Sequence, residues 1–442
     1  MTPLDTASRS ACIALLAAEV AAAPFAAAQS PAIDRAQAQR YFADAERLSD
    51  TDGGRLWGVE LYGPTLFVDP ATRALVANVP DDTGALRAVG GVYVGSLPPE
   101  QNVANTAVEW AGQRWTMVMW PLPADRYARQ RLVMHELFHR VQPALGITGS
   151  DPANAHLETR DGRIWLRLEW RALEEALLRA GSERTRAVAD AVAFRARRHG
   201  LFPEGAEEER ALEQNEGLAE YTGLTLSGLP ATVLADRAAV GLAGREGSER
   251  LARSFAYGSG PAYGVLLDEA GAEWRERAVA GADLGDLLAE AYGVAAAAGQ
   301  AEQRTGAYDH ERLIAAETRR ADRIAAELTR LREIFLEGPT LRLVPEGSFR
   351  YVFDPNGATP LAGVGTVYQA SRVSAAWGVL TVTSGGVLLE LSELGITGVV
   401  VPAPADAAEP PLEGEGWRLE LAEGWRVVPA ERPGSWVVVK EE

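Results

Sequence analysis

The spacing of hydrophobic and polar positions changes twice along the chain. Residues 31–48 repeat at a helical interval, whereas over 56–80 short apolar runs are separated by Gly, Pro and Asp, which is typical of strands. Further strands are expected at 91–95 and 115–120, and 105–120 has the pattern of a hairpin around an Ala-Gly-Gln sequence. The pattern therefore predicts a small sheet that follows one helix.

From residue 125 to residue 337 the apolar spacing is that of helices. Asp125 is placed to cap the first of these, which should run to Gln142, where Pro143 ends it. Further helices are expected at 164–181, 183–199, 207–225, 233–256, 262–279, 283–292 and 308–336.

Residues 340–442 return to short apolar runs between Gly, Pro and Asn turns, which predicts a separate all-β sandwich or barrel. The preceding domain should span 31–337, with a β-rich stretch at 50–120 and a helical stretch at 125–337. The expected fold class is thus α+β. A length of 442 residues agrees with two domains better than with one.

The N-terminus carries an apolar, Ala-rich stretch at 11–28 that follows Arg9 and ends in three alanines. This pattern predicts a signal peptide over 1–28, and hence a periplasmic or extracellular protein; a cytoplasmic protein is the alternative. The stretch is too short and too interrupted for a membrane anchor, and no other run is long enough, so we expect no integral membrane segment. Cys12 is the single cysteine, which excludes an intrachain disulfide.

Charge and composition exclude two classes of protein. The chain has 43 Lys and Arg against 61 Asp and Glu, for a net charge of −18, and has no basic patch with interleaved aromatics, so a nucleic-acid partner is not expected. With 47% hydrophobic and 24% charged residues it has the composition of a globular protein, not of a disordered chain.

One motif carries chemistry, the sequence His-Glu-Leu-Phe-His at 135–139. Positions four residues apart share one face of a helix, so the imidazoles of His135 and His139 can bind one metal ion. Glu136 can act as the base toward a water molecule on that metal, because zinc lowers the pKa of water toward neutrality. The alternative is a structural helix with two solvated or core histidines.

A catalytic zinc site needs a third protein ligand, and the segment 214–223 offers one. Glu216 and Glu220 lie one helical turn apart there. Glu216 can bind the metal while Glu220 hydrogen-bonds the far nitrogen of a ligand histidine and so fixes its tautomer. The alternative is a solvated acidic helix face.

The motif at 135–139 together with the downstream Asn-Glu-Gly-Leu-Ala-Glu-Tyr sequence resembles the gluzincin metallopeptidases, the thermolysin-like clan. The resemblance covers roughly residues 110–225. It implies a zincin-like fold for the domain at 31–337 and a zinc-dependent peptidase that holds one zinc ion. By position, His135, His139 and Glu216 would be the metal ligands, Glu136 the general base, and Glu220 the partner of a ligand histidine.

The same resemblance implies that a strand before the motif helix, at the edge of the sheet, pairs with an extended peptide or protein substrate. The strand Trp115–Trp120 is the candidate for this role, and a buried strand is the alternative. The interval between His139 and Glu216 is longer than in thermolysin, which implies an inserted helical excursion at 150–205.

Attack on a carbonyl develops an oxyanion, which needs a hydrogen-bond donor. Tyr257 and Tyr263 are the candidate catalytic donors, with Arg253 and Tyr221 as further ones; aromatic packing between helices is the alternative role of the tyrosines. The sequence Gly-Ser-Gly-Pro at 258–261 predicts an adjustable turn beside them.

Surface or capping roles are expected for His156, His199 and His310. Two functions besides a peptidase stay open: a catalytically inactive zincin-fold binding protein whose β domain carries recognition, and a scaffold with a fortuitous motif. A site of two histidines and one glutamate binds several divalent metals, so zinc is expected from the resemblance. The oligomeric state is left open.

Overall fold

The computed structural model describes residues 33–353, 357–393, 395–404, 406 and 411–441. Helices make up 47% and strands 22%, so the expected α+β class is confirmed. The predicted signal peptide, 1–28, lies outside the described residues. The chain divides into two compact units; of the described residues, 33–158 and 165–308 belong to the first, and 159–164 and those from 309 onward belong to the second.

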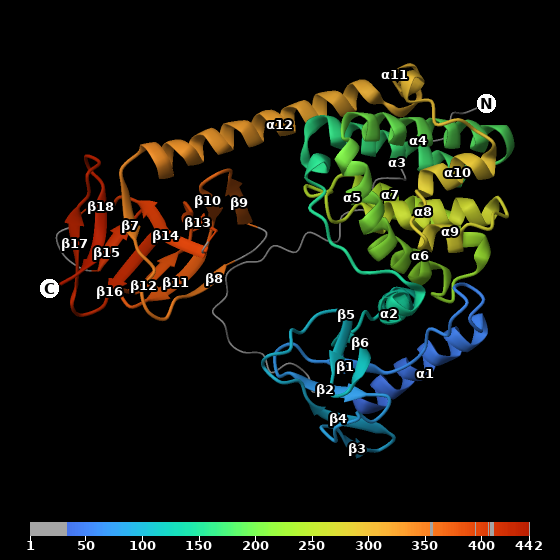
Figure 1. Cartoon of the computed structure of the whole chain (residues 1–442), viewed down its shortest axis with the longest axis horizontal. Helices are drawn as coiled ribbons and strands as arrows, with labels where there is room; N and C mark the ends of the chain where they lie inside the picture. Colours follow the sequence, from blue (N-terminus) through green and yellow to red (C-terminus); the bar gives the residue numbers. More distant parts are fainter. Residues whose placement is uncertain (1–32, 354–356, 394, 405, 407–410, 442) are drawn as a thin grey trace, which may run out of the picture. The chain divides into compact units, whose positions relative to one another are not determined.

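The first unit contains one mixed sheet whose strands lie in the order β3-β4-β2-β1-β6-β5 (Figure 1). The central pair, β1 and β6, is parallel, and β6 forms an antiparallel hairpin with β5. Ala111 and Gly112 at the hairpin turn have φ angles of 49° and 89°, the backbone that a tight two-residue hairpin requires. The strands are β1 (Thr65–Val68), β2 (Ala74–Ala77), β3 (Arg87–Val89), β4 (Val92–Ser96), β5 (Thr106–Trp110) and β6 (Gln113–Met119).

This order corrects one expectation. The strand predicted at 115–120 is β6, which pairs with β1 on one side and β5 on the other, and its Trp115 and Met117 are fully buried. The strand therefore has no free edge. The edge of the sheet on this side is β5, whose side chains are half-buried or exposed.

Helices form the rest of the first unit. Phe42 of the first helix stacks on Phe67 of β1, with ring centroids 4.4 Å apart, so that helix covers one face of the sheet. The helices are α1 (Arg35–Asp52), α2 (Arg126–Val141), α3 (Arg160–Leu178, which begins in the second unit), α4 (Gly181–Leu201), α5 (Pro203–Leu212), α6 (Leu218–Thr225), α7 (Leu234–Glu246), α8 (Ala256–Glu269), α9 (Arg275–Val279), α10 (Leu284–Tyr292) and α11 (Ala301–Arg304).

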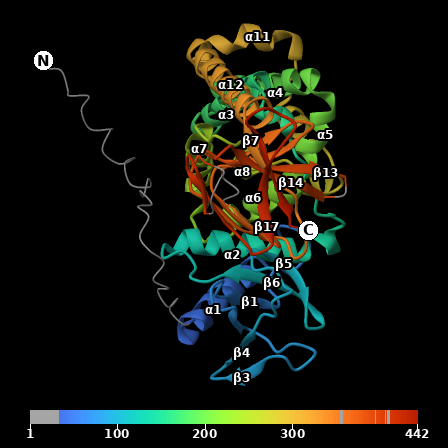
Figure 2. The ribbon, with the colours of Figure 1, turned by 90° about the vertical axis from the view of Figure 1, so that its left-hand side faces the viewer.

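Helix α2 has a central place in this unit. It packs on β5 and β6 on one side and on α6 on the other, and Figures 1 and 2 both show it between the sheet and the helical layer. Gly223 of α6 permits the close approach, because a Cβ there would lie 2.6 Å from the carbonyl oxygen of Arg131. The motif helix is thus held from two sides.

The predicted turn at 258–261 is wrong, because these residues lie inside the helix α8. Glycine is unfavourable in a helix unless close packing compensates for it. A Cβ on Gly260 would lie 2.3 Å from the carbonyl oxygen of Gly217, and a Cβ on Gly264 would lie 2.2 Å from the ring of Tyr221. The glycines of α8 therefore bring it against the segment that carries Glu216.

The second unit is a β-sandwich with one long helix. A seven-stranded sheet, β17-β18-β7-β14-β13-β10-β9, and a five-stranded sheet, β15-β16-β12-β11-β8, share a core that includes Trp377, Leu380 and Val399. The strands are β7 (Thr340–Leu343), β8 (Arg350–Phe353), β9 (Ala358–Leu361), β10 (Gly365–Tyr368), β11 (Ser371–Ala375), β12 (Gly378–Val382), β13 (Val387–Ser392), β14 (Gly395–Pro402), β15 (Leu412–Gly414), β16 (Trp417–Leu421), β17 (Trp425–Pro429) and β18 (Trp436–Lys440).

The long helix α12 (His310–Arg332) and its last turn η7 (Glu333–Glu337) belong to this second unit. Leu331 and Phe335 pack in one cluster with Leu361 and Val400 of the seven-stranded sheet, and the Nε of Arg163 donates to Glu317 at 2.8 Å. The division between the units consequently falls at residue 308, whereas the sequence placed it between 337 and 340.

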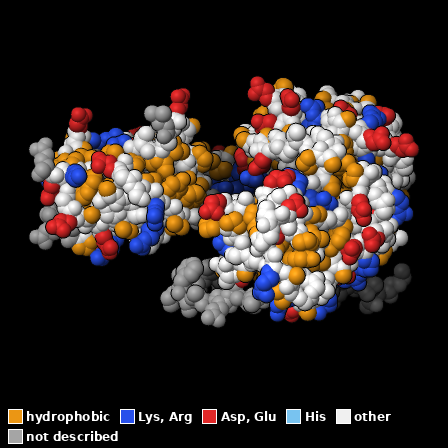
Figure 3. Space-filling model, turned by 60° about the horizontal axis from the view of Figure 1, so that its bottom comes forward, with side chains coloured by type: hydrophobic (Ala, Val, Ile, Leu, Met, Phe, Trp, Pro, Cys, Tyr) orange, Lys and Arg blue, Asp and Glu red, His pale blue; other side chains and the backbone are white. Residues whose placement is uncertain are grey.

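No helix in the described part of the chain combines the length and the apolarity needed to cross a bilayer. On the face drawn in Figure 3, acidic and basic side chains are interspersed among apolar ones.

Candidate metal centre

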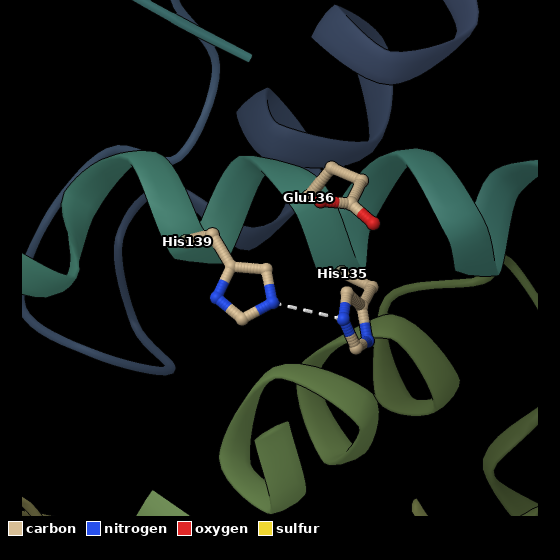
Figure 4. Close-up of side chains that lie close together, drawn as sticks. All are labelled: His135, Glu136 and His139. Atoms are coloured by element: carbon tan, nitrogen blue, oxygen red, sulfur yellow. Dashed lines mark hydrogen bonds between the residues drawn. The ribbon is translucent and has the colours of Figure 1, made fainter. Parts of the chain in front are cut away.

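The histidine motif lies on α2, as its spacing predicted. Asp125 caps the helix, since its Oδ1 accepts from the amide of Ala128 at 2.8 Å. Leu137 and Phe138 are fully buried and fix the rotation of the helix about its axis. His135 and His139 are thereby directed to the same side of α2, and Figure 4 shows their rings turned toward each other.

Three potential ligand atoms lie close together beside this helix. The Nε2 atoms of His135 and His139 are 3.0 Å apart, and Oε2 of Glu216 lies 3.4 Å from each of them. The sequence therefore identified the two histidines and the distant glutamate that the fold brings to one point.

Glu216 reaches this point from a π-helical turn that the sequence did not predict. The expected helix 207–225 is divided into α5 and α6 by η3 (Glu213–Gly217), a π-helix of the kind that recurs at functional sites. Arg195 holds Glu213 with two hydrogen bonds of 3.0 and 2.7 Å, and Gln214 donates to the carbonyl of Ala278 at 2.9 Å. These anchors fix the turn through contacts that lie far away in the sequence.

The far nitrogen of each histidine has its own partner. Nδ1 of His135 lies 2.8 Å from Oε2 of Glu220, which the sequence predicted for this role, and Arg131 donates to the other oxygen of Glu220 at 2.6 Å. Nδ1 of His139 lies 2.8 Å from Oε1 of Gln142. Sequence reasoning missed Gln142, although its position three residues after His139, at the end of the predicted helix, was a signal.

Charge coupling shifts the titration of these groups. Burial disfavours a charged His135, but hydrogen bonds to Glu216 and Glu220 outweigh it and raise the pKa of His135 to about 10. Burial also opposes ionisation of Glu220, yet the hydrogen bond to His135 and the charge of Arg131 lower the pKa of Glu220 to about 2. The ionised carboxylates of Glu216 and Glu220 thus favour a positive charge at His135.

Glu136 is the odd member of the cluster. It is 4% exposed, its Oε2 has no hydrogen-bond partner among the described residues, and burial raises its pKa. Buried polar atoms are nearly always paired, so an unpaired carboxylate oxygen is a feature that calls for a functional explanation. Ligand atoms of His135, Glu136 and His139 lie within 4.8 Å of one another.

These groups line a pocket of about 280 Å³ in the first unit. Its other walls come from β5, its N-terminal neighbour Asn105 and β6, from the 3-10 turn and loop after α2, from η3 and from α8. The lining residues besides His135, Glu136, His139 and Glu216 are Asn105, Thr106, Ala107, Arg114, Gln142, Pro143, Ile147, Gly149, Asn215 and Tyr257.

Tyr257 is the one predicted oxyanion donor that lines this pocket. Its hydroxyl donates to Oε2 of Glu216 at 2.6 Å, and its ring lies parallel to that of His135, at an angle of 8°. Burial and the neighbouring Glu216 carboxylate raise the pKa of Tyr257. The hydroxyl therefore keeps its proton and can donate it in a hydrogen bond.

The other predicted donors lie away from the pocket. Tyr263 is fully buried on a different face of α8, where its hydroxyl donates to Glu169 at 2.8 Å. It is therefore no longer a candidate for the site. Tyr221 bonds to Asp268 and Arg275, and Arg253 is an exposed side chain paired with Asp151. Helical periodicity explains the difference between the tyrosines, since six residues separate Tyr257 from Tyr263 and such positions face different sides of a helix.

Two of the remaining histidines are part of a buried ionic cluster. His156 and His199 lie 2.7 and 3.1 Å from the fully buried Glu209, which Arg198 also binds. The side chain of His156 is 8% exposed, so of the expected surface or capping role the surface role is wrong. His310 begins α12.

Comparisons of the chain with protein-family models, with curated proteins and with solved structures found no match. A function can consequently be inferred only from the residues and the geometry of the pocket.

Proposed function

We propose that this protein is a zinc-dependent peptidase of the gluzincin type, with His135, His139 and Glu216 as metal ligands and Glu136 as the general base. The observation that carries the proposal is the triangle formed by two Nε2 atoms and Oε2 of Glu216, with sides of 3.0, 3.4 and 3.4 Å. Zinc bonds of about 2.0–2.1 Å in tetrahedral geometry separate neighbouring ligand atoms by about 3.3–3.4 Å. The side chains are thus spaced for one ion.

The chemistry of the donors supports zinc. Two imidazoles and one carboxylate are a common ligand set of catalytic zinc, in which a fourth position stays open. Glu216 is the better third ligand than Glu136, because its Oε2 is equidistant from both histidines, whereas Glu136 follows His135 directly on the helix. A partner on each Nδ1 leaves each Nε2 free to bind the ion.

A zinc ion in this site would supply Lewis-acid chemistry, which polarises a carbonyl group and makes water acidic near neutral pH. Glu136 would accept a proton from the attacking water and deliver it to the leaving amine. Its buried, unpaired oxygen and its raised pKa suit a base that must both take up and release a proton. The Tyr257 hydroxyl would donate a hydrogen bond to the oxyanion.

The edge strand supports a peptide substrate. Thr106 and Ala107 of β5 line the pocket, and β5 pairs with β6 on one side only among the described strands. An extended peptide can add to such an edge through main-chain hydrogen bonds, which would carry it past Glu136. The alternative of a catalytically inactive binding protein gives no reason for a buried Glu136 oxygen, Oε2, that has no hydrogen-bond partner among the described residues. With a predicted signal peptide, we place the activity outside the cytoplasm.

The test is hydrolysis of an unfolded protein, such as reduced casein, by the zinc-loaded full chain and by Glu136→Gln. The variant keeps the shape of the side chain but cannot accept a proton. We expect it to retain zinc and thermal stability and to lose about 10²–10⁴-fold in rate. Glu100→Gln, a change of the same kind at an exposed position outside the pocket, should leave the rate unchanged. Equal rates for wild type and Glu136→Gln would overturn the proposal.

A further inference from the structure

We infer that Gln142 is a positioning residue that joins His139 to the segment carrying Glu216, so that one side chain orients two of the three proposed metal ligands. The inference rests on the proposed metal site. Gln142 follows directly after α2 and is 4% exposed. Its Oε1 lies 2.8 Å from Nδ1 of His139, and its Nε2 donates to the carbonyl of Asn215 at 2.7 Å.

The direction of this amide is set by chemistry. A main-chain carbonyl can only accept, so the nitrogen end of Gln142 must face Asn215. The oxygen end is then left to face His139, whose Nδ1 must carry the proton. Reversing the amide would place one carbonyl oxygen against another. Gln142 therefore selects the tautomer of His139 in which Nε2 has a free lone pair toward the pocket.

The same side chain restrains the third ligand. Asn215 immediately precedes Glu216 in the π-helical turn η3, and its Nδ2 lies 3.3 Å from Oε1 of Glu216. The Asn215 carbonyl belongs to the peptide group that precedes Glu216, so holding this carbonyl also restrains the backbone from which the Glu216 side chain extends. Gln142 and Asn215 are 73 positions apart in the sequence, so this hydrogen bond links the end of α2 directly to η3, which the chain connects only through a long intervening segment.

A neutral partner also suits the charge of the site. The His135 ring is held by the anionic Glu220, which Arg131 in turn neutralises. If residue 142 were acidic, its carboxylate would face the Asn215 carbonyl without a proton between them, and the site would gain a third carboxylate, whose charge one dication would not balance. With Gln142 the pocket keeps two carboxylates, Glu136 and Glu216, which balance one dication.

The matched control is Gln214, which also anchors η3 by an amide. Its Nε2 donates to the carbonyls of Ala278 and Val279 at 2.9 and 3.1 Å, and it does not line the pocket. Gln142→Met removes both polar ends but keeps length and apolar volume, so the helix end stays packed. Gln142→Glu keeps an acceptor for His139 and removes the donor to Asn215. Gln214→Met removes an anchor of η3 alone.

Two readouts test the inference on the full chain. The first is the tautomer of the neutral His139 ring in the metal-free protein, from nitrogen NMR shifts of ¹⁵N-labelled histidine. We expect the Nδ1-protonated form in wild type, Gln142→Glu and Gln214→Met, and a mixture of tautomers in Gln142→Met. The second readout is zinc affinity by chelator competition, for which we expect Gln142→Met to bind about 10–100-fold more weakly than wild type. Gln214→Met should change the affinity little, because Arg195 still holds Glu213 of η3 with two hydrogen bonds.

The outcomes separate the two proposals. An unchanged His139 tautomer and unchanged zinc affinity in Gln142→Met would overturn the inference, as would an equal loss in Gln214→Met, which would show that anchoring η3 is enough. Absence of zinc binding by the wild type would overturn the proposal that the protein is a zinc-dependent peptidase. The tautomer comparison, made without metal, would still decide the role of Gln142.

Discussion

The hydroxyl of Tyr257 donates a hydrogen bond of 2.6 Å to Oε2 of Glu216, the same carboxylate oxygen that faces both histidines. The tyrosine comes from α8 and the glutamate from η3, and the close contact between Gly260 and Gly217 brings these two elements together. The packing of two glycines thus determines where a hydroxyl meets the proposed metal ligand.

Tyr257→Phe tests whether that hydroxyl stabilises the transition state. The ring would still stack on His135, so we expect zinc content and KM to stay near the wild-type values. Loss of a donor to the oxyanion should lower kcat by about 10²–10³-fold. Steady-state kinetics with a fluorogenic peptide measures both constants. A lowered zinc affinity with an unchanged kcat of the zinc-loaded variant would instead give Tyr257 a purely positioning role.

Removing Glu220, the hydrogen-bond partner of His135, should weaken zinc binding. In Glu220→Gln the Nδ1 of His135 loses an anionic acceptor and Arg131 loses its partner, so we expect zinc affinity to fall by about 10–100-fold. Competition with a chelator measures this. Arg245→Gln is the control, because Arg245 lies 3.7 Å from Glu220 and should contribute little. Equal zinc affinities in Glu220→Gln and wild type would contradict the assignment.

The glycine contact between α8 and η3 predicts a sharp effect on stability. In Gly260→Ala the new Cβ would lie 2.3 Å from the carbonyl oxygen of Gly217, so the helix must move, and we expect a loss of more than about 2 kcal/mol in the free energy of unfolding. Gly244→Ala, in α7, has open space around the new Cβ and should gain up to about 1 kcal/mol. Urea denaturation compares the two. Similar free energies for both variants would mean that α8 does not rest on η3.

Acid should destabilise the ionic cluster that anchors η3. Burial opposes ionisation of Asp283, but the charge of Arg195, 2.7 Å away, lowers the pKa of Asp283 from 3.8 to about 2. A lowered pKa in the folded state means that the stabilisation is present above about pH 4 and is lost as the pH falls to about 2. The shift corresponds to roughly 2 kcal/mol in the free energy of unfolding.

Asp283→Asn isolates this effect, because asparagine still caps α10. We expect the variant to be less stable than wild type at neutral pH and to show a flatter decline between about pH 4 and pH 2. Urea unfolding at a series of pH values measures both curves. Parallel curves for the two proteins over that interval would rule out Asp283 as the source of the decline.

Local patterns were enough to find most elements and the core of the candidate site. The helix that begins after Asp125 and ends before Pro143 follows from capping and proline rules, and the spacing of His135 and His139 follows from helical periodicity. Glu216 and Glu220 were placed by their spacing and by a resemblance to a family. Each of these features depends on residues that are close together in sequence.

The features that were missed depend on tertiary contacts. Glycines at 258–261 read as a turn, yet they form a helix because Gly260 packs on Gly217. The strand at 115–120 reads as a possible edge, but the order of the strands is set by pairing with β1 and β5. The π-helical turn that presents Glu216 is held by Arg195, eighteen residues from its partner Glu213. No periodicity within the sequence contains such information.

The measurement that tests the central claim most directly is the metal content of the purified chain. Elemental analysis after removal of loosely bound ions should find about one zinc per chain in the wild type and almost none in a variant with His139→Ala and Glu216→Ala. If the wild-type chain contains no bound metal, even after zinc has been added back, the result would contradict the account. The histidine motif would then be a feature of a structural helix.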